Sequence, residues 1–210
     1  AELAGLPQWV VWRTVTRDGK PTKVLVNPKT GTHASSTDPK TWSTYDHATE
    51  SSPNYDGVGF VFWPADPYTG VDLDHCFHED GELAPWAQEI VDTLDSYTEY
   101  SPSGNGLHIW IRATLPPGRR RKGGVEMYDQ GRYFTITGKP YPGCRTTIEE
   151  RQDEITALHA RIFPPVEKPS PCAHKPKPGA LRDVSDIQLL ERATQAKNGD
   201  LFGRLYAGDK

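Results

Sequence analysis

Two aspartates separated by a single residue are the strongest chemical signal in the chain. Asp72 and Asp74 alternate with the apolar Val71 and Leu73, so a β-strand here places both carboxylates on one face and both aliphatic side chains on the other. Like charges side by side repel each other unless a cation neutralises them. Hard carboxylate oxygens suit Mg²⁺ or Mn²⁺. The spacing therefore predicts a divalent-metal site, and two solvated acids at a strand end are the alternative.

The same alternation in two later strands adds groups to that face. Over residues 107–112 and 125–128, the apolar positions that parity assigns to the core are Leu107, Ile109, Ile111, Val125 and Met127. His108, Glu126 and Tyr128 then point to the opposite face. Three carboxylates from separate strands, Asp72, Asp74 and Glu126, could hold two divalent cations about 3.5–4 Å apart, as in two-metal phosphoryl transfer. The alternative for Glu126 alone is an ordinary buried ion pair.

A glycine-rich loop runs into the His108 strand. Ser103, Gly104 and Gly106 come just before His108. Glycines let backbone N–H groups approach an anion closely, and the serine hydroxyl and the imidazole add further donors. The loop therefore predicts a site for a nucleoside triphosphate, and a plain hairpin turn is the alternative.

Basic and acidic residues are unevenly distributed along the chain. Residues 41–111 contain thirteen Asp and Glu, and all 24 Lys and Arg lie outside that stretch. An acidic centre in a basic frame is what an enzyme acting on nucleic acid needs, although uneven surface charge is an alternative. A basic loop is predicted to contact backbone phosphates, with a solvated charge run as the alternative: Arg119, Arg120, Arg121 and Lys122. Lys23 and Arg132 are single basic residues near strand starts, and we expect Arg132 to reach the site from its strand's entrance.

The pattern of elements predicts an α+β fold, with helices on one face of an antiparallel or mixed sheet and an open, acid-lined other face. Strands are expected over residues 8–16, 22–27, 57–63, 71–74, 97–101, 107–112, 124–128 and 132–137, and helices over 44–51, 84–97 and 148–162. We expect the 57–63 strand to pair antiparallel with the strand of Asp72. Thr147 and Glu150 have the spacing of a capping box for the last helix.

The chain divides by composition into three parts. We expect a catalytic domain over residues 1–163, a proline-rich linker over 164–182 and a small helical segment over 183–210, together forming the N-terminal part of a larger protein. No apolar run approaches the ~20 residues of a membrane span, so a soluble, intracellular protein is expected. Cys76, Cys144 and Cys172 are scattered and lack paired metal-ligand spacing, which argues against a zinc site.

Three motifs in order resemble the primase-polymerase branch of the archaeo-eukaryotic primase superfamily, found in phage and plasmid replication proteins. They are Val71-Asp-Leu-Asp74, Ser103-Gly-Asn-Gly-Leu-His108 and Val125-Glu-Met-Tyr128, and Gly131 to Gly138 follows them. The resemblance spans about residues 9–138.

The resemblance implies an RRM-like catalytic sheet, template-directed nucleotide addition and priming without a pre-existing primer. It assigns Asp72, Asp74 and Glu126 to Mg²⁺ or Mn²⁺, although many relatives have Asp in place of Glu126. Ser103, Gly104, Gly106, His108 and Arg132 would hold the triphosphate. Lys23, Tyr128 and residues 119–122 would contact single-stranded DNA template and primer. A fused or associated helicase is expected, in the bacterial host cytoplasm if the protein is phage-encoded.

Two other functions fit parts of the pattern. A metal-dependent nuclease of the rolling-circle or repair type also places acids and a histidine on a sheet, but it needs no triphosphate loop. A non-catalytic, RRM-like nucleic-acid-binding module would bind DNA without turnover.

Overall fold

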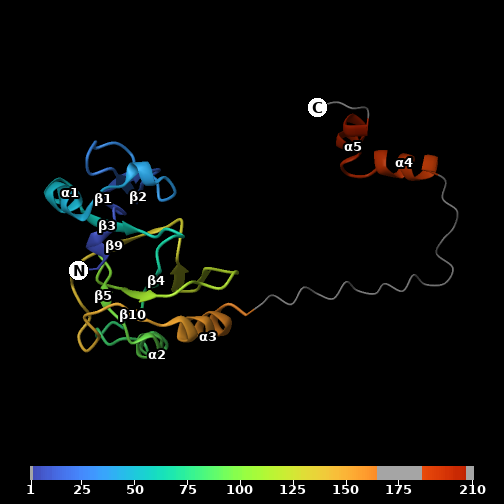
Figure 1. The fold of residues 1–210 in the computed structure, drawn as a ribbon. Coiled ribbons are helices and arrows are strands. Elements are labelled where there is room, and N and C mark those ends of the chain that lie inside the picture. Colours follow the sequence, from blue (N-terminus) through green and yellow to red (C-terminus); the bar gives the residue numbers. More distant parts are fainter. Residues whose placement is uncertain (1, 165–185, 207–210) are drawn as a thin grey trace. The chain divides into compact units, whose positions relative to one another are not determined.

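The computed structural model describes residues 2–164 and 186–206 (Figure 1). These two parts belong to separate compact units and are described separately. The second part contains two helices, α4 (Asp186–Thr194) and α5 (Gly199–Tyr206), within the stretch where a small helical segment was expected. The predicted linker over residues 164–182 lies, except for its first residue, outside the described residues.

The first unit begins with a four-stranded antiparallel sheet. It contains β1 (Trp9–Arg17), β2 (Lys20–Val26), β3 (Gly57–Val61) and β9 (Tyr133–Ile136), in the order β2-β1-β3-β9. Helix α1 (Tyr45–Ser51) starts at Thr44, whose side-chain oxygen accepts a hydrogen bond from the backbone N–H of His47. Three short 3₁₀ helices lie at Leu3–Gly5, Pro39–Thr41 and Ser52–Asn54.

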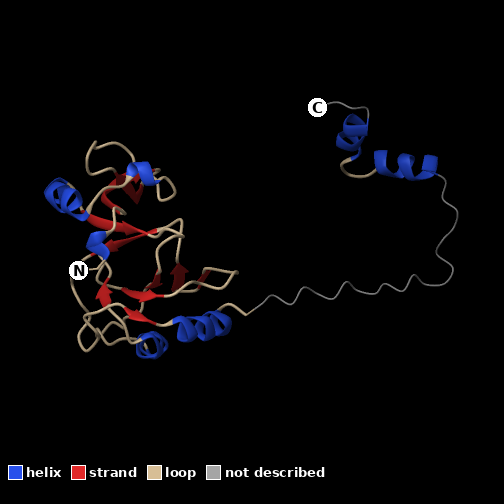
Figure 2. Ribbon diagram, viewed as in Figure 1, coloured by secondary structure: helices blue, strands red, loops and turns tan. Residues whose placement is uncertain are grey.

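The second sheet of this unit has six strands and carries the predicted site. It consists of β4 (Tyr68–Leu73), β5 (Thr98–Tyr100), β6 (Leu107–Arg112), β7 (Arg121–Lys122), β8 (Val125–Tyr128) and β10 (Glu149–Glu150). Only β10 pairs in parallel, with β6. Helices α2 (Pro85–Leu94) and α3 (Gln152–Ile162) lie beneath this sheet, on the side away from the first sheet (Figures 1 and 2). The α+β class with a mixed sheet and helices on one face is confirmed.

Strand parity correctly separated the two faces of the six-stranded sheet. Its aliphatic face packs on α2 and α3 and buries Val71, Leu73, Leu107, Ile109, Ile111, Val125 and Met127. Burial of side chains of this size stabilises the fold by about 1.5–3 kcal/mol each. The acidic side chains therefore lie on the face that turns away from the helices.

That opposite face is not open, as the sequence had suggested, because the four-stranded sheet covers much of it. Trp110 of β6 is fully buried there and packs against Phe62 and Phe134. A Cβ added to Gly70 would lie 2.4 Å from the ring of Phe62, so only glycine allows the sheets to come this close. The acids occupy one end of this inter-sheet interface.

Two details of the predicted topology were wrong. β3 and β4 do not pair with each other: β3 lies between β1 and β9, and β4 lies between β6 and β8. Helix α3 begins at Gln152 and not at residue 148, because Glu149 and Glu150 form β10 and Ile148 is buried between the sheets. The Thr147 hydroxyl donates to the Glu149 carboxylate and does not cap a helix.

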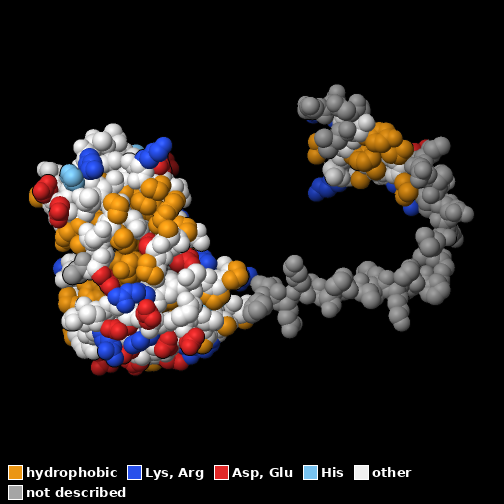
Figure 3. All heavy atoms as spheres, in the orientation of Figure 1, with side chains coloured by type: hydrophobic (Ala, Val, Ile, Leu, Met, Phe, Trp, Pro, Cys, Tyr) orange, Lys and Arg blue, Asp and Glu red, His pale blue; other side chains and the backbone are white. Residues whose placement is uncertain are grey.

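Acidic and basic side chains are interspersed over the visible face of the 2–164 unit, and hydrophobic side chains gather in its upper part (Figure 3).

No helix in the described parts of the chain combines the length and apolar character needed to cross a membrane.

Candidate active site

Asp72, Glu126 and His108 lie on one rung of the six-stranded sheet. Asp72 on β4 is the direct cross-strand partner of Glu126 on β8 and, on its other side, of His108 on β6. The three side chains line a pocket of about 160 Å³ at the end of the inter-sheet interface. We call it the acid pocket; its full lining is Lys23, Asp72, His108, Glu126, Tyr128, Arg132, Tyr133, Phe134 and Thr135.

Asp72 has the most perturbed carboxyl group of the site. Burial, followed by the negative charges of Asp74 and Glu126, raises its pKa to about 7. Its Oδ1 atom is buried and has no hydrogen-bond partner. A buried, unpartnered carboxylate oxygen is costly, so the site favours the approach of a proton or a cation.

His108 faces Oδ1 of Asp72 with its Nε2 atom, which cannot donate a hydrogen bond to this oxygen when the ring is neutral. The Nδ1 atom lies 3.0 Å from the Thr135 carbonyl oxygen and donates to it, because a carbonyl only accepts. Burial lowers the pKa of His108 to about 4, so the ring is neutral near pH 7. The Nε2 atom is then an acceptor and lies 3.7 Å from Oδ1 of Asp72. Two acceptors facing each other leave room for a cation or a donor.

Glu126 is held by two neighbours. Its Oε1 atom lies 3.0 Å from Nε of Arg121, and its Oε2 atom accepts a 2.7 Å hydrogen bond from the Tyr128 hydroxyl. Arg121 is its cross-strand partner on β7. These two contacts orient the Glu126 carboxylate. The contact with Arg121 would be lost if Glu126 bound a cation.

Asp74 lies just beyond the end of β4 and does not line the acid pocket, although its charge acts on Asp72. Its backbone N–H donates to Gly124 O at 2.8 Å. Gly106 packs on this segment so closely that an added Cβ would lie 2.6 Å from the Leu73 carbonyl oxygen. The glycine loop therefore lies beside Asp74, and its residues Ser103, Gly104 and Gly106 are not among those lining the acid pocket.

The acids fit a divalent cation on the chemistry of their donors and on the unpartnered Oδ1 atom of Asp72. In the described ranges, no three His, Cys, Asp or Glu side chains are close enough to enclose a metal ion as they stand. Asp72 and Glu126 would form the core of such a site, and the side chain of Asp74 would have to turn toward them.

Besides His108, three of the predicted nucleic-acid or nucleotide contacts line the acid pocket: Lys23, Tyr128 and Arg132. Lys23 reaches it from β2, with Nζ 5.0 Å from the centre of the Trp12 ring. Burial lowers the pKa of Lys23, and the attraction of Asp72 and Asp74 opposes this shift. The Arg132 guanidinium lies 5.2 Å from the centre of the Tyr128 ring. Positive charge therefore faces the acids across the pocket.

The basic loop is largely engaged within the protein. The Arg120 side chain donates to Pro116 O and lies 3.7 Å from Asp129. Nζ of Lys122 donates to Ile162 O at the end of α3, and Arg121 pairs with Glu126. Of the four, only Arg119 has a side chain without a hydrogen bond or ion pair within the described residues, and it is exposed.

Sequence reasoning missed the buried carboxylate of Glu99. It accepts hydrogen bonds from the Tyr97 hydroxyl and from the backbone N–H groups of Thr137 and Gly138. Burial raises its pKa. Glu99 thereby fixes the chain just after β9, two residues from the Thr135 carbonyl that orients His108. An acid at a core-facing strand position was the only available signal.

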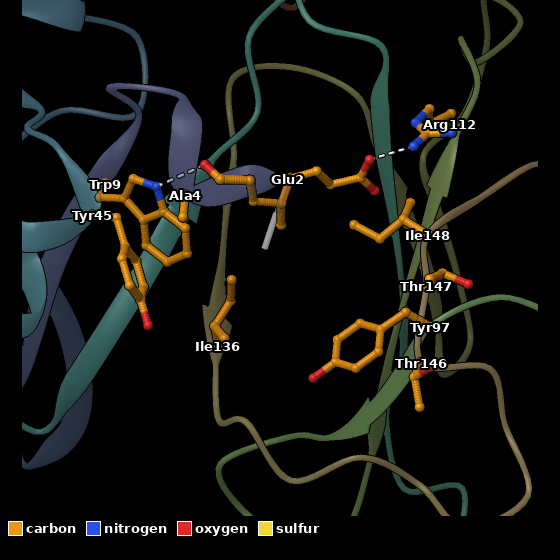
Figure 4. Close-up of a pocket in the computed structure, with 11 residues that line it drawn as sticks. Glu2, Ala4, Trp9, Tyr45, Tyr97, Arg112, Ile136, Thr146, Thr147 and Ile148 are labelled. Carbon is orange, nitrogen blue, oxygen red and sulfur yellow. Dashed lines mark hydrogen bonds and ion pairs between the residues drawn. The ribbon is translucent and has the colours of Figure 1, made fainter.

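A larger cavity of the first unit does not contain these acids. It measures about 540 Å³, and Figure 4 shows Trp9 and Tyr45 on one side of it and Tyr97, Ile148 and Arg112 on the other. Arg112 lies four residues beyond His108 on β6, so this cavity is at the opposite end of the inter-sheet interface.

Over 216 aligned positions, the chain is 35% identical to a protein named DNA Primase-polymerase from Nitratiruptor phage NrS-1. The chain is a homologue of this phage primase-polymerase. The alignment includes 97% of the chain but 29% of the phage protein. No family model matches the chain. The primase-polymerase resemblance indicated by the motifs is thus confirmed.

Proposed function

We propose that the chain carries the nucleotidyl-transfer site of a DNA primase-polymerase, which starts and extends a strand on a single-stranded DNA template. The observation that carries this proposal is the single rung of Asp72, Glu126 and His108, with one Asp72 oxygen buried and unpartnered. The homology to the phage primase-polymerase supports it. As a nuclease would use similar acids, the test below separates the two activities.

Different residues of the site would bind the metal ions and the incoming nucleotide. Asp72, Glu126 and Asp74 would hold Mg²⁺ or Mn²⁺. When bound, these ions acidify the attacking hydroxyl and neutralise charge on the triphosphate. His108 and Arg132, with the loop of Ser103, Gly104 and Gly106, would position the triphosphate of the incoming nucleotide.

The nucleic acid would meet the remaining basic and aromatic groups. Lys23 and Tyr128 line the acid pocket, and the exposed Arg119 has a side chain available for phosphate. Arg120 and Lys122 would contribute charge near the strand while keeping their internal contacts, and Arg121 would become available when Glu126 binds a cation. An associated helicase and action in the host cytoplasm belong to the same proposal and rest on the resemblance.

Nucleotide incorporation tests the proposal. The purified chain is incubated with template, labelled deoxynucleotides and Mn²⁺, with and without a primer. We expect incorporation by the parent protein, at least about 100-fold less by Asp72→Asn because a charged ligand is lost, and unchanged activity of Glu79→Gln, an exposed acid outside the pocket. Cleavage of labelled DNA without any incorporation would instead identify a nuclease.

A further inference from the structure

A second pocket continues from the acid pocket toward the β1–β2 hairpin. It measures about 310 Å³ and shares Lys23, Arg132 and Tyr133 with the acid pocket. Its other walls come from the end of β1, from β2 and from the loop that follows β2. We call it the basic pocket; the residues that complete its lining are Arg17, Val24, Leu25, His33, Ala34, Ser35 and Ser36.

The basic side chains of this pocket are not ion-paired in the described part of the chain, although Lys23 and Arg132 also face the carboxylates of the acid pocket. Within the part of the chain that the structure describes, no Asp or Glu lines it, and Arg17, Lys23 and Arg132 form no ion pair with a carboxylate. Lys23 and Arg132 lie over the aromatic rings of Trp12 and Tyr128 instead. Cation–π contacts hold a cationic group in place without cancelling its charge. The pocket is therefore set up to attract an anion.

Hydrogen bonds connect the two walls of the basic pocket. The Ser36 hydroxyl donates to Gly131 O at 3.0 Å, which ties the loop after β2 to the turn before β9. The Ser35 and Thr37 hydroxyls are 3.0 Å apart and hold the loop from within. Ser35 thus presents a further hydroxyl in a wall whose position is already fixed, which reduces the entropy lost on binding.

We propose that the basic pocket binds phosphodiester groups of the DNA strand that enters the acid pocket. The inference rests on the proposed function, since a strand positioned for transfer at Asp72 has to continue out of a pocket of about 160 Å³. Through Lys23 and Arg132, the basic pocket is a continuous and positively charged exit. Arg17 and His33, which the motifs did not single out, are the residues specific to it.

Binding of single-stranded DNA to the full chain tests this site. Affinity of a labelled oligonucleotide is measured by fluorescence anisotropy over a series of salt concentrations, without nucleotide or divalent cation. We expect Arg17→Ala to weaken binding about 3- to 10-fold and to make the log–log salt slope shallower by about 0.7. Arg13→Ala is the matched control, because Arg13 is exposed on the same strand but outside the pocket. His33→Ala should weaken binding by less, because an imidazole offers fewer hydrogen-bond donors to a phosphate than a guanidinium does.

Three results are decisive. Equal affinity and equal salt slope for Arg17→Ala and Arg13→Ala would overturn the proposal. So would an Arg17→Ala variant with unchanged DNA affinity and a raised KM for the triphosphate, because the pocket would then serve the nucleotide. Full incorporation activity of Asp72→Asn would contradict the proposed function but not the DNA site, which is measured without catalysis.

Discussion

Asp72 and Glu126 are direct cross-strand partners on β4 and β8, and both are on the face of the sheet that turns away from the helices. Like charges at this position destabilise a sheet by up to about 1 kcal/mol, the upper end of cross-strand pair effects. A protein that keeps such a pair at the end of a buried interface gives up stability at that place for the sake of a site.

Replacement of Asp72 by Asn should stabilise the metal-free protein at high pH. The folded-state pKa of Asp72 is raised to about 7 by burial and by Asp74 and Glu126. Between about pH 4 and pH 7 the folded state therefore binds more protons than the unfolded state, so stability falls as pH rises through this window. At pH 8 in EDTA we expect Asp72→Asn to be more stable than the parent by about 1–3 kcal/mol, with no difference near pH 4. Urea unfolding at the two pH values measures this.

The effect of Mg²⁺ on the unfolding midpoint tests whether Asp72 binds a cation. Cations that bind the folded state should raise the unfolding midpoint of the parent at pH 8 and leave that of Asp72→Asn nearly unchanged. An equal increase for both proteins would mean that the cation binds elsewhere.

His108→Asn should separate the fold from nucleotide binding. The Asn amide can still donate to the Thr135 carbonyl, as Nδ1 of His108 does, but nothing then replaces Nε2. We expect a rise in the KM for the triphosphate of about 10-fold or more, because Nε2, protonated when the anionic triphosphate binds, would donate one hydrogen bond to a charged group. Thermal unfolding in parallel should show a small change. An unchanged KM would remove His108 from the nucleotide site.

Glu99→Ala should be among the more damaging substitutions outside the acid pocket. It leaves the Tyr97 hydroxyl and two backbone N–H groups without an acceptor. We expect a loss of about 3 kcal/mol or more in the free energy of unfolding, and a smaller loss for Glu99→Gln, which keeps one acceptor oxygen. Glu79→Ala, at an exposed position, is the control and should stay within about 0.5 kcal/mol of the parent.

The two glycines of the loop should differ in their response to alanine. Gly104 has φ +73° with open space around it, so Gly104→Ala should cost about 1 kcal/mol of stability through the backbone alone. Gly106 has no room for a Cβ, because the Leu73 carbonyl oxygen would be 2.6 Å away. We expect a larger loss for Gly106→Ala, and urea unfolding of the two variants tests the order.

The alternation of apolar and polar residues along single strands correctly predicted which residues of β4, β6 and β8 share a face of the sheet. It could not predict which strands become neighbours, because pairing depends on contacts between distant parts of the chain. The assignment of β3 and β4 to different sheets follows from the packing of Phe62, Trp110 and Phe134. The same packing buries Ile148 between the sheets, so α3 begins after this residue, at Gln152.

For the site residues as well, the sequence predicted the face of the sheet but not the contacts between distant segments. Asp72, Glu126 and His108 lie on one face as the parity of their strands requires, and the pairing of β4 with β6 and β8 brings them together. The internal contacts of Arg120 and Lys122 could not be predicted, since they depend on where α3 and Asp129 lie in space. Glu99 was missed because its strand position alone does not show that the backbone N–H groups of Thr137 and Gly138 reach its carboxylate.

The most direct test of the account is to locate the cations. Crystals of the protein are soaked with Mn²⁺ and a non-hydrolysable deoxynucleotide triphosphate, and anomalous scattering is measured at a manganese-sensitive wavelength. The account predicts anomalous peaks within about 2–2.3 Å of carboxylate oxygens of both Asp72 and Glu126, next to the triphosphate. A bound triphosphate with manganese that touches neither carboxylate would contradict it.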